Sequence, residues 1–196
     1  FKVDKYYACE IDDKAIKISK KNYPTIIQLG SVVDFKTSMI TEKVDLLIGG
    51  SPCVDLSIAK QNRKGLEGDK SSLFYEYLRI MKEVKPRYFV LENVASMKQS
   101  ERDIITKEMG VEPVLFNASL LSAQLRKRYF WTNIKFELPK DKNIILKDII
   151  QNGKVNDYFM GKNGKALCLT SSYNKKGGSI TEIEKCKKGT YKLNFI

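Results

Sequence analysis

The sequence contains no histidine. Pairing of a serine or cysteine nucleophile with a histidine of this chain is therefore excluded. The four cysteines, Cys9, Cys53, Cys168 and Cys186, include no C-x-x-C pair, so the zinc-ligand spacing is absent as well. No paired disulfide framework is visible either, which indicates a reduced, intracellular protein.

Long apolar runs are also absent. No stretch is long enough to span a membrane, and the first residues show no signal-peptide pattern. We therefore expect a cytoplasmic protein, and the cysteine spacing together with the lack of histidine predicts that it holds no metal. Its 196 residues suffice for one domain with a core and a smaller appendage.

Acidic residues are few relative to basic ones. The chain has 35 Lys and Arg against 23 Asp and Glu, a formal charge of +12. This excess suits a polyanionic partner, because each neutralised phosphate releases a counterion. A lysine-rich proteome would give the same excess, so both explanations stay open at this point.

The strongest chemical signal is the segment GGSPCVDLS at residues 49–57. It follows the apolar run 44–48, which is typical of a buried parallel strand, and its glycines and proline end that strand. Cys53 is therefore expected at the carboxyl end of a strand, where open α/β sheets bind ligands. This placement favours a nucleophile, although a buried free cysteine is also a common small core residue.

Two later segments strengthen this interpretation. The apolar run 88–91 ends in Glu92-Asn93-Val94, and residues 124–128 read Q-L-R-K-R. Together, PC-x-x-x-S, ENV and Q-x-R-x-R resemble the DNA cytosine-5 methyltransferase family, in its order and roughly its spacing. GGSPCVDLSI followed by RKGL resembles the animal de novo branch most. The resemblance covers about residues 5–131.

The resemblance implies an S-adenosylmethionine-dependent, Rossmann-like α/β fold with a doubly wound, mainly parallel sheet. The chain pattern agrees, since expected strands at 5–12, 25–30, 44–48 and 88–91 alternate with expected helices at 13–22, 71–84 and 96–108. Segments 112–117 and 127–134 would add one antiparallel pair. We expect a partial catalytic domain at 1–138 and the start of a target-recognition region at 139–196, where a disordered basic tail is the alternative.

The chemistry implied by the family is methyl transfer to C5 of cytosine. Attack of the Cys53 thiolate on C6 makes C5 nucleophilic, and nearby cations such as Arg128 favour the thiolate. Glu92 would share a proton with N3, and Arg128 would donate to O2. Arg126 would fix the loop or a phosphate. The cytosine must be flipped out of the duplex, since none of this fits inside stacked DNA.

The resemblance also assigns cofactor contacts. Glu10 would accept from the ribose hydroxyls of S-adenosylmethionine, and Asp34 from the adenine amino group, with Val33 against the ring. From the residues alone, Glu10 is better explained as an ordinary acid before a helix, and Asp34 is explained nearly as well as a loop or cap residue. The full set of predicted cofactor contacts is Glu10, Ile11, Val33, Asp34, Pro52 and Leu73.

Substrate contacts follow from the same resemblance. Asn93 and Pro52 would shape the cytosine pocket. Arg63 and Lys64 lie in a long polar loop that would close over flipped DNA and contact phosphates. The full set of predicted substrate contacts is Ser57, Arg63, Lys64, Asn93 and Gln124, with double-stranded DNA as the expected partner.

Two elements of the family pattern are not found in this sequence. One is a first strand with an F-x-G-x-G cofactor loop, expected before Phe1; the other is an Arg-Leu-rich motif, expected after Ile196. We therefore expect a gap in the sheet, and either a fragment, a truncated gene or a split enzyme completed by a second polypeptide. Exposed strand edges should make this chain unstable or prone to aggregation by itself.

Three functions stay open from the sequence. The first is a DNA cytosine-5 methyltransferase of the restriction-modification type. The second is a catalytically degenerate subunit that binds DNA or regulates a methyltransferase. The third is a methyltransferase acting on cytosine in RNA, which basic charge does not distinguish from the first.

Overall fold

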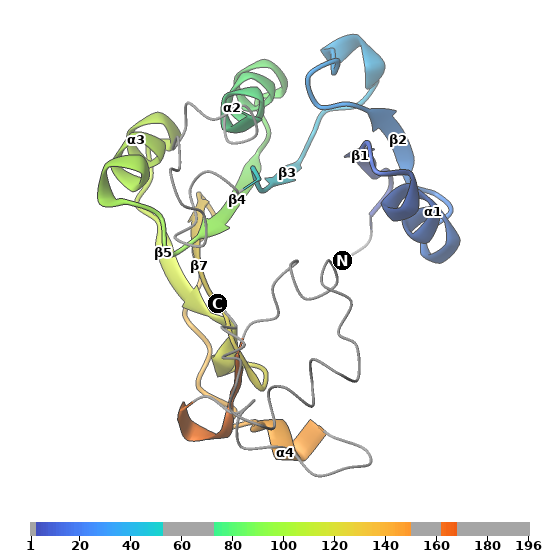
Figure 1. Cartoon of the computed structure of the whole chain (residues 1–196). Helices are drawn as coiled ribbons and strands as arrows, with labels where there is room; N and C mark the ends of the chain where they lie inside the picture. Colours follow the sequence, from blue (N-terminus) through green and yellow to red (C-terminus); the bar gives the residue numbers. More distant parts are fainter. Residues whose placement is uncertain (1–2, 53–72, 150–161, 168–196) are drawn as a thin grey trace, which may run out of the picture. The chain divides into compact units, whose positions relative to one another are not determined.

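The structure is a computed structural model that describes residues 3–52, 73–149 and 162–167 (Figure 1). The chain divides into two compact units. The first consists of Phe1–Val114 and Tyr129–Lys135, and the second of Leu115–Arg128 and Phe136–Ile196. The boundary at 138/139 expected from the sequence stays a prediction.

The first elements form a small parallel β-α-β arrangement. They are β1 (Tyr7–Cys9), α1 (Asp13–Asn22) and β2 (Ile27–Gly30). β1 and β2 pair in parallel. The carboxylate of Asp12 caps α1 by accepting the backbone N–H groups of Lys14 and Ala15, at 2.8 and 3.2 Å. The expected helix at 13–22 is confirmed, whereas both strands are shorter than expected.

The second sheet has the strand order β3-β4-β7-β5. Its strands are β3 (Leu46–Gly49), β4 (Tyr88–Val94), β7 (Lys127–Thr132) and β5 (Val114–Asn117). β3 and β4 are parallel, with Gly49 opposite Leu91. Within the described residues, this sheet is separate from the β1–β2 pair. The sequence analysis expects a gap in the sheet, and these two groups of strands form separate sheets.

One apolar core joins the second sheet to two helices, α2 (Leu73–Val84) and α3 (Gln99–Met109). Trp131 of β7 is completely buried, and its Nε1 donates to Thr106 Oγ1 at 3.0 Å. Because α2 repeats apolar residues at helical spacing, one of its faces enters this core. The buried cluster comprises Phe74, Tyr77, Leu78, Leu91, Val94, Met97, Ile105, Met109 and Trp131.

Several element boundaries differ from the sequence-based expectation, and two of them bear on the site and its core. β4 continues to Val94, so Glu92 and Asn93 are strand residues rather than residues after a strand. α3 begins at Gln99 instead of residue 96. It ends at Gly110, whose φ of +67° is the left-handed conformation that glycine adopts without strain.

The second unit contains short elements. They are η3 (Ala118–Leu120), β6 (Gln124–Leu125), α4 (Leu146–Ile149), η5 (Lys162–Gly164) and β8 (Ala166–Leu167). β6 and β8 pair in parallel, with Gln124 opposite Ala166. A segment of the lysine-rich region after residue 138 is therefore tied directly to the start of the Q-x-R-x-R motif.

Candidate active site

The turn after β3 packs tightly against α2 and β4. A Cβ added to Gly49 would lie 2.5 Å from Cδ2 of Tyr77, so the aromatic ring rests directly on the glycine backbone. A Cβ added to Gly50 would lie 3.1 Å from Glu92 Oε2 and 3.3 Å from the Glu92 carbonyl oxygen. Because Gly49 and Gly50 have no side chains, the chain that leads to Cys53 can pass close to Tyr77 and to Glu92, the predicted catalytic acid.

Asn93 connects the same turn to β4. Its side chain is 1% exposed, and its Nδ2 donates to Ser51 Oγ at 3.0 Å. Its Oδ1 accepts the backbone N–H of Val94 at 2.8 Å. A buried amide left without partners would cost roughly 1–3 kcal/mol, so these bonds fix the orientation of Asn93. The predicted ENV and PC segments are therefore in contact through Ser51 and Gly50.

The nucleophile expected from the sequence, Cys53, lies outside the described residues. The same holds for Ser57, Arg63 and Lys64, which were expected to contact DNA. Pro52 is described, is half-buried, and ends the turn that Glu92 and Asn93 contact. The roles predicted for these five residues stay predictions.

Glu10 follows β1 at its carboxyl end. Its Oε1 accepts the backbone N–H groups of Ile11 and Asp12, at 2.7 and 2.9 Å, which orients the carboxylate. Within the described residues, its Oε2 has no hydrogen-bond partner. Since Cys9 lies opposite Gly30 in the parallel pair, the turn that follows β2 begins at the same edge of the sheet.

That turn contains Val33 and Asp34, both exposed. The N–H of Val33 donates to Ser31 Oγ at 3.2 Å, and the N–H of Asp34 to the Ser31 carbonyl at 3.2 Å. The Val33 side chain is 55% exposed. The structure thus places the predicted ribose acid and the predicted adenine contacts after neighbouring strands.

Arg79 of α2 holds this turn and was not singled out from the sequence. Its guanidinium donates to the carbonyls of Val32 (3.1 Å) and Phe35 (3.2 Å). Glu76 and Glu83 accept from the same guanidinium at 2.8 and 3.1 Å. The i,i+3 and i,i+4 spacing of these charges predicts the ion pairs. The hydrogen bonds from Arg79 to the turn after β2 cannot be predicted from neighbouring residues, because the turn lies far away in the sequence.

The residues at this edge fit a nucleoside cofactor such as S-adenosylmethionine. A carboxylate with one oriented oxygen and one oxygen without a protein partner can accept from a ribose diol. An exposed valine, Val33 in the turn after the neighbouring strand, offers apolar surface to an aromatic base. Leu73 is half-buried at the first turn of α2, and its predicted cofactor contact stays a prediction.

The predicted arginine segment belongs to the second unit. The backbone N–H of Arg126 donates to Asn117 Oδ1 at 3.1 Å, and its carbonyl accepts the N–H of Ala118 at 3.0 Å. Nη1 of Arg128 donates to the Lys127 carbonyl at 2.8 Å. The sequence analysis did not single out Asn117, although a polar residue at the end of an apolar strand could have indicated it.

Two negative findings apply to the part of the chain that the structure describes. None of the helices there is both long and apolar enough to cross a bilayer. No group of three or more His, Cys, Asp or Glu side chains there is arranged to hold a metal ion.

A match to a protein-family model identifies the family to which the chain belongs. Residues 1–195 match the family model of the C-5 cytosine-specific DNA methylases. The chain belongs to this family. The resemblance inferred from the PC, ENV and Q-x-R-x-R segments is thereby confirmed.

Relatives similar to this chain come from a phage and a bacterium. The chain is 32% identical over 161 residues to the orphan methyltransferase M.SPRI of Bacillus phage SPR, covering 74% of this chain and 36% of that protein. It is 32% identical over 166 residues to the type II methyltransferase M.NgoPII of Neisseria gonorrhoeae, covering 73% of this chain and 48% of that protein. The chain therefore spans between about a third and a half of these relatives.

A solved structure shows the same fold. It is the crystal structure of a protein assigned as a DNA modification methyltransferase encoded within an E. coli prophage. The TM-score is 0.52 at 22% identity, and the match covers 86% of this chain and 47% of that chain. The expected α/β fold of the methyltransferase type is confirmed.

Proposed function

We propose that this chain carries catalytic residues of a DNA cytosine-5 methyltransferase that uses S-adenosylmethionine. The observation that carries the proposal is the packing of the turn before Cys53 against Glu92 and Asn93. It joins two segments that lie about 40 residues apart in the sequence and that the chemistry requires on one cytosine. Membership of the C-5 cytosine methylase family supports it.

In this proposal Cys53 is the nucleophile and forms a covalent bond to C6 of the flipped cytosine. Electron density moves to C5, which takes the methyl group. When bound, S-adenosylmethionine would supply that group from its sulfonium, and the rest of the cofactor would leave as a neutral thioether. A base then removes the C5 proton, the C6–S bond breaks, and Cys53 leaves with its electron pair.

Glu92 and the arginines stabilise this reaction. Glu92 shares a proton with N3 of the ring, and its close packing against Gly50 supports a place for its carboxyl group beside the cysteine turn. Arg128 donates to O2, and Arg126 fixes the loop or a phosphate. Gln124, Ser57 and Asn93 line the cytosine side of the pocket.

The remaining predicted residues would bind the cofactor and the DNA backbone. Glu10 accepts from the ribose hydroxyls, and Asp34 from the adenine amino group, beside Val33. Arg63 and Lys64 contact phosphates, in keeping with the net charge of +12. Phage and bacterial relatives support an intracellular protein of the modification type. The further cofactor contacts are Ile11, Pro52 and Leu73.

Transfer of labelled methyl groups from S-adenosylmethionine to mixed-sequence duplex DNA tests the proposal in the full-length gene product. We expect label on cytosine C5, and a loss of roughly 1,000-fold or more in Cys53→Ala. Cys9→Ala is the matched control, because it removes an exposed thiol outside the proposed chemistry. Undiminished transfer by Cys53→Ala would contradict the covalent role.

The same assay separates the alternatives. In a competition with equal nucleotide concentrations of RNA, label should stay on the duplex DNA. Preferential labelling of RNA would favour the RNA cytosine methyltransferase. Retained DNA binding without any transfer would favour a degenerate binding or regulatory subunit.

A further inference from the structure

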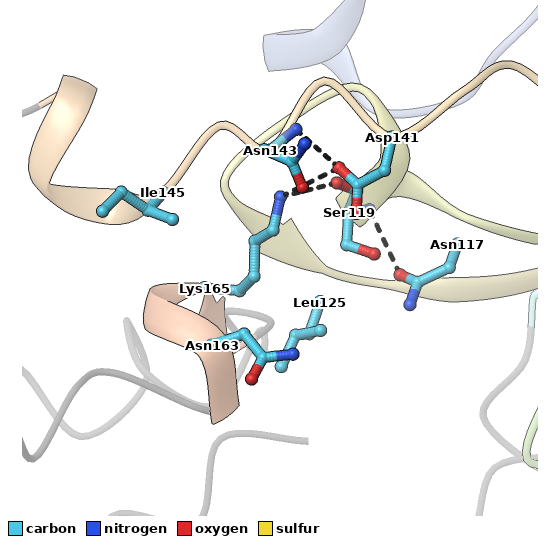
Figure 2. Close-up of a pocket in the computed structure, with 8 residues that line it drawn as sticks. All are labelled: Asn117, Ser119, Leu125, Asp141, Asn143, Ile145, Asn163 and Lys165. Carbon is cyan, nitrogen blue, oxygen red and sulfur yellow. Dashed lines mark hydrogen bonds and ion pairs between the residues drawn. The ribbon is translucent and has the colours of Figure 1, made fainter.

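The second unit contains a buried lysine ammonium. Lys165 is 5% exposed, and its Nζ donates to the carbonyls of Ser119 (2.8 Å) and Ser122 (3.2 Å). Asp141 Oδ1 lies 3.6 Å from the same nitrogen. Figure 2 shows the lysine side chain reaching from the residue after η5 toward Ser119 and Asp141. An ammonium has three donors, and three protein oxygens surround this one.

A lysine is almost never buried unless it is paired, because its charge is strongly hydrated in water. Here the pairing involves three separate segments of the chain. Asp141 Oδ1 also accepts the N–H of Asn143 at 2.7 Å, which fixes the carboxylate. The arrangement therefore has a defined geometry.

The carbonyls that Lys165 binds belong to one short turn, residues 119–123, and the same turn is held at two further positions. The Leu120 carbonyl accepts the N–H of Lys142 at 2.8 Å, and the Ala123 carbonyl accepts the N–H of Ala166 at 2.6 Å. Segments near residues 141 and 165 thus fix this turn from outside it.

The turn leads directly into the Q-x-R-x-R motif. Gln124 follows it and pairs with Ala166, the residue after Lys165. Asn117 Oδ1 accepts the N–H groups of both Ser119 (3.2 Å) and Arg126 (3.1 Å), so the turn and the arginine share one side-chain acceptor. A displacement of the turn would therefore move Arg126.

We propose that Lys165 is a positioning residue that fixes the turn at residues 119–123 and, through it, the segment 124–128 whose arginines hold the flipped cytosine. The catalytic consequence rests on the proposed function of those arginines. The proposal that Lys165 fixes this segment in place rests only on the contacts of Lys165.

A pocket of about 310 Å³ lies beside the lysine and is lined also by Asn117, Leu125, Asn143 and Asn163 (Figure 2). A bound anion in this pocket would be an alternative reason for a buried cation. The contacts argue against it, because Ser119, Ser122 and Asp141 already surround the Lys165 ammonium. Positioning of the turn is the better explanation.

Hydrogen exchange in the full-length protein tests directly whether Lys165 fixes residues 119–128 in place. Lys165→Met keeps the length of the side chain and removes its charge, Lys165→Arg keeps the charge, and Lys147→Met removes the charge of an exposed lysine of α4. We expect amides of residues 119–128 to exchange roughly tenfold faster in Lys165→Met, without change in α2 and β4. Lys147→Met should match the wild type. Unchanged exchange at 119–128 in Lys165→Met would overturn the proposal.

Single-turnover methyl transfer tests the consequence. We expect Lys165→Met to lower the rate roughly 10- to 100-fold while the dissociation constant for DNA changes less than about threefold. Lys165→Arg should recover part of the rate, and Arg126→Gln should add little to Lys165→Met, because both act through one segment. An unchanged rate, or additive losses, would overturn the positioning role. A wild-type protein that transfers no methyl group would overturn the proposed function. Hydrogen exchange would in that case still decide whether Lys165 fixes residues 119–128 in place.

Discussion

The first unit contains two strand-helix-strand arrangements with very different packing. In β1–α1–β2 and in β3–α2–β4, two parallel strands are connected through a segment that contains a helix. α2 buries Phe74, Tyr77, Leu78 and Ile80, whereas α1 buries no residue. The same local topology thus has an apolar core in one case and mainly hydrogen bonds in the other.

The exposed apolar side chains show the same contrast. Ile11, Ile18 and Val33 in the first arrangement are 76, 63 and 55% exposed, while Leu91 and Ile105 of the core are 0% exposed. Full burial of such a side chain stabilises a fold by roughly 1.5–3 kcal/mol. The predicted adenosine edge therefore has lower local stability than the edge that carries Glu92 and Asn93.

The largest expected effect compares two isoleucines on helices. Ile105→Ala should lower the free energy of unfolding by roughly 2–5 kcal/mol, because it leaves a cavity in a closed core. Ile18→Ala, at a 63% exposed position, should change it by less than about 0.5 kcal/mol. Hydrogen exchange of the α3 and α1 amides in the full-length protein measures both losses. A comparable loss in Ile18→Ala would show that α1 is covered in solution and would remove the contrast.

The next effect compares the glycines that end β2 and β3. Gly49→Ala should destabilise by roughly 1–3 kcal/mol, because its Cβ would enter the Tyr77 ring. Gly30 has open space around it but a φ of +80°, so Gly30→Asn should be tolerated because asparagine adopts this conformation readily. The midpoints of thermal unfolding of the two variants measure the difference. A stable Gly49→Ala protein would mean that the turn before Cys53 packs less tightly than described.

A smaller effect is expected at the helix cap of the loosely packed arrangement. Asp12→Ala removes the acceptor for two backbone N–H groups and should cost about 1 kcal/mol. Asp13→Ala, in the first turn of α1, should cost only a few tenths of a kcal/mol, because only a favourable charge is lost. Hydrogen exchange of the α1 amides measures both, and exchange in α2 should not change. Equal costs would show that the cap is not what defines α1.

The smallest effect concerns pH and an exposed contact near β1. Hydrogen bonds from Lys5 and Tyr7 lower the pKa of Glu42 from 4.5 to about 2. A carboxyl group whose pKa is lowered on folding stabilises the fold above its unfolded pKa, and this contribution disappears as the pH falls from about 4.5 to 2. Glu42→Gln should remove that part of the acid dependence and leave the core unchanged. Both groups are exposed, so the change should be small. An identical acid profile for wild type and Glu42→Gln would contradict the contact.

Much of the fold could be predicted from local sequence. The limits of α1 follow from Asp12 as a cap and from apolar residues at helical spacing, and both signals are local. The end of β4 could not be predicted, because Glu92 and Asn93 are polar, and their contacts with Gly50 and Ser51 come from a segment far away in the sequence. A prediction from polarity alone therefore ends β4 too early.

The candidate site divides in the same way. Residue types and spacing marked Cys53, Glu92, Asn93 and the arginines, since the motif chemistry is encoded along the chain. Arg79 and Lys165 could not be found, because their partners are backbone carbonyls more than 40 residues away in the sequence. Every residue carries a carbonyl, so a bond to one leaves no pattern in the sequence.

The sequence by itself determined the family and the order of most strands and helices, because short-range periodicity and motif spacing encode them; it also predicted the residue types of the candidate site. Only the tertiary structure decided which strands join one sheet, which of two similar helices is buried, and which cations hold the loops. Those outcomes depend on contacts between segments far apart in the chain, where close packing and the desolvation of buried charges select one arrangement.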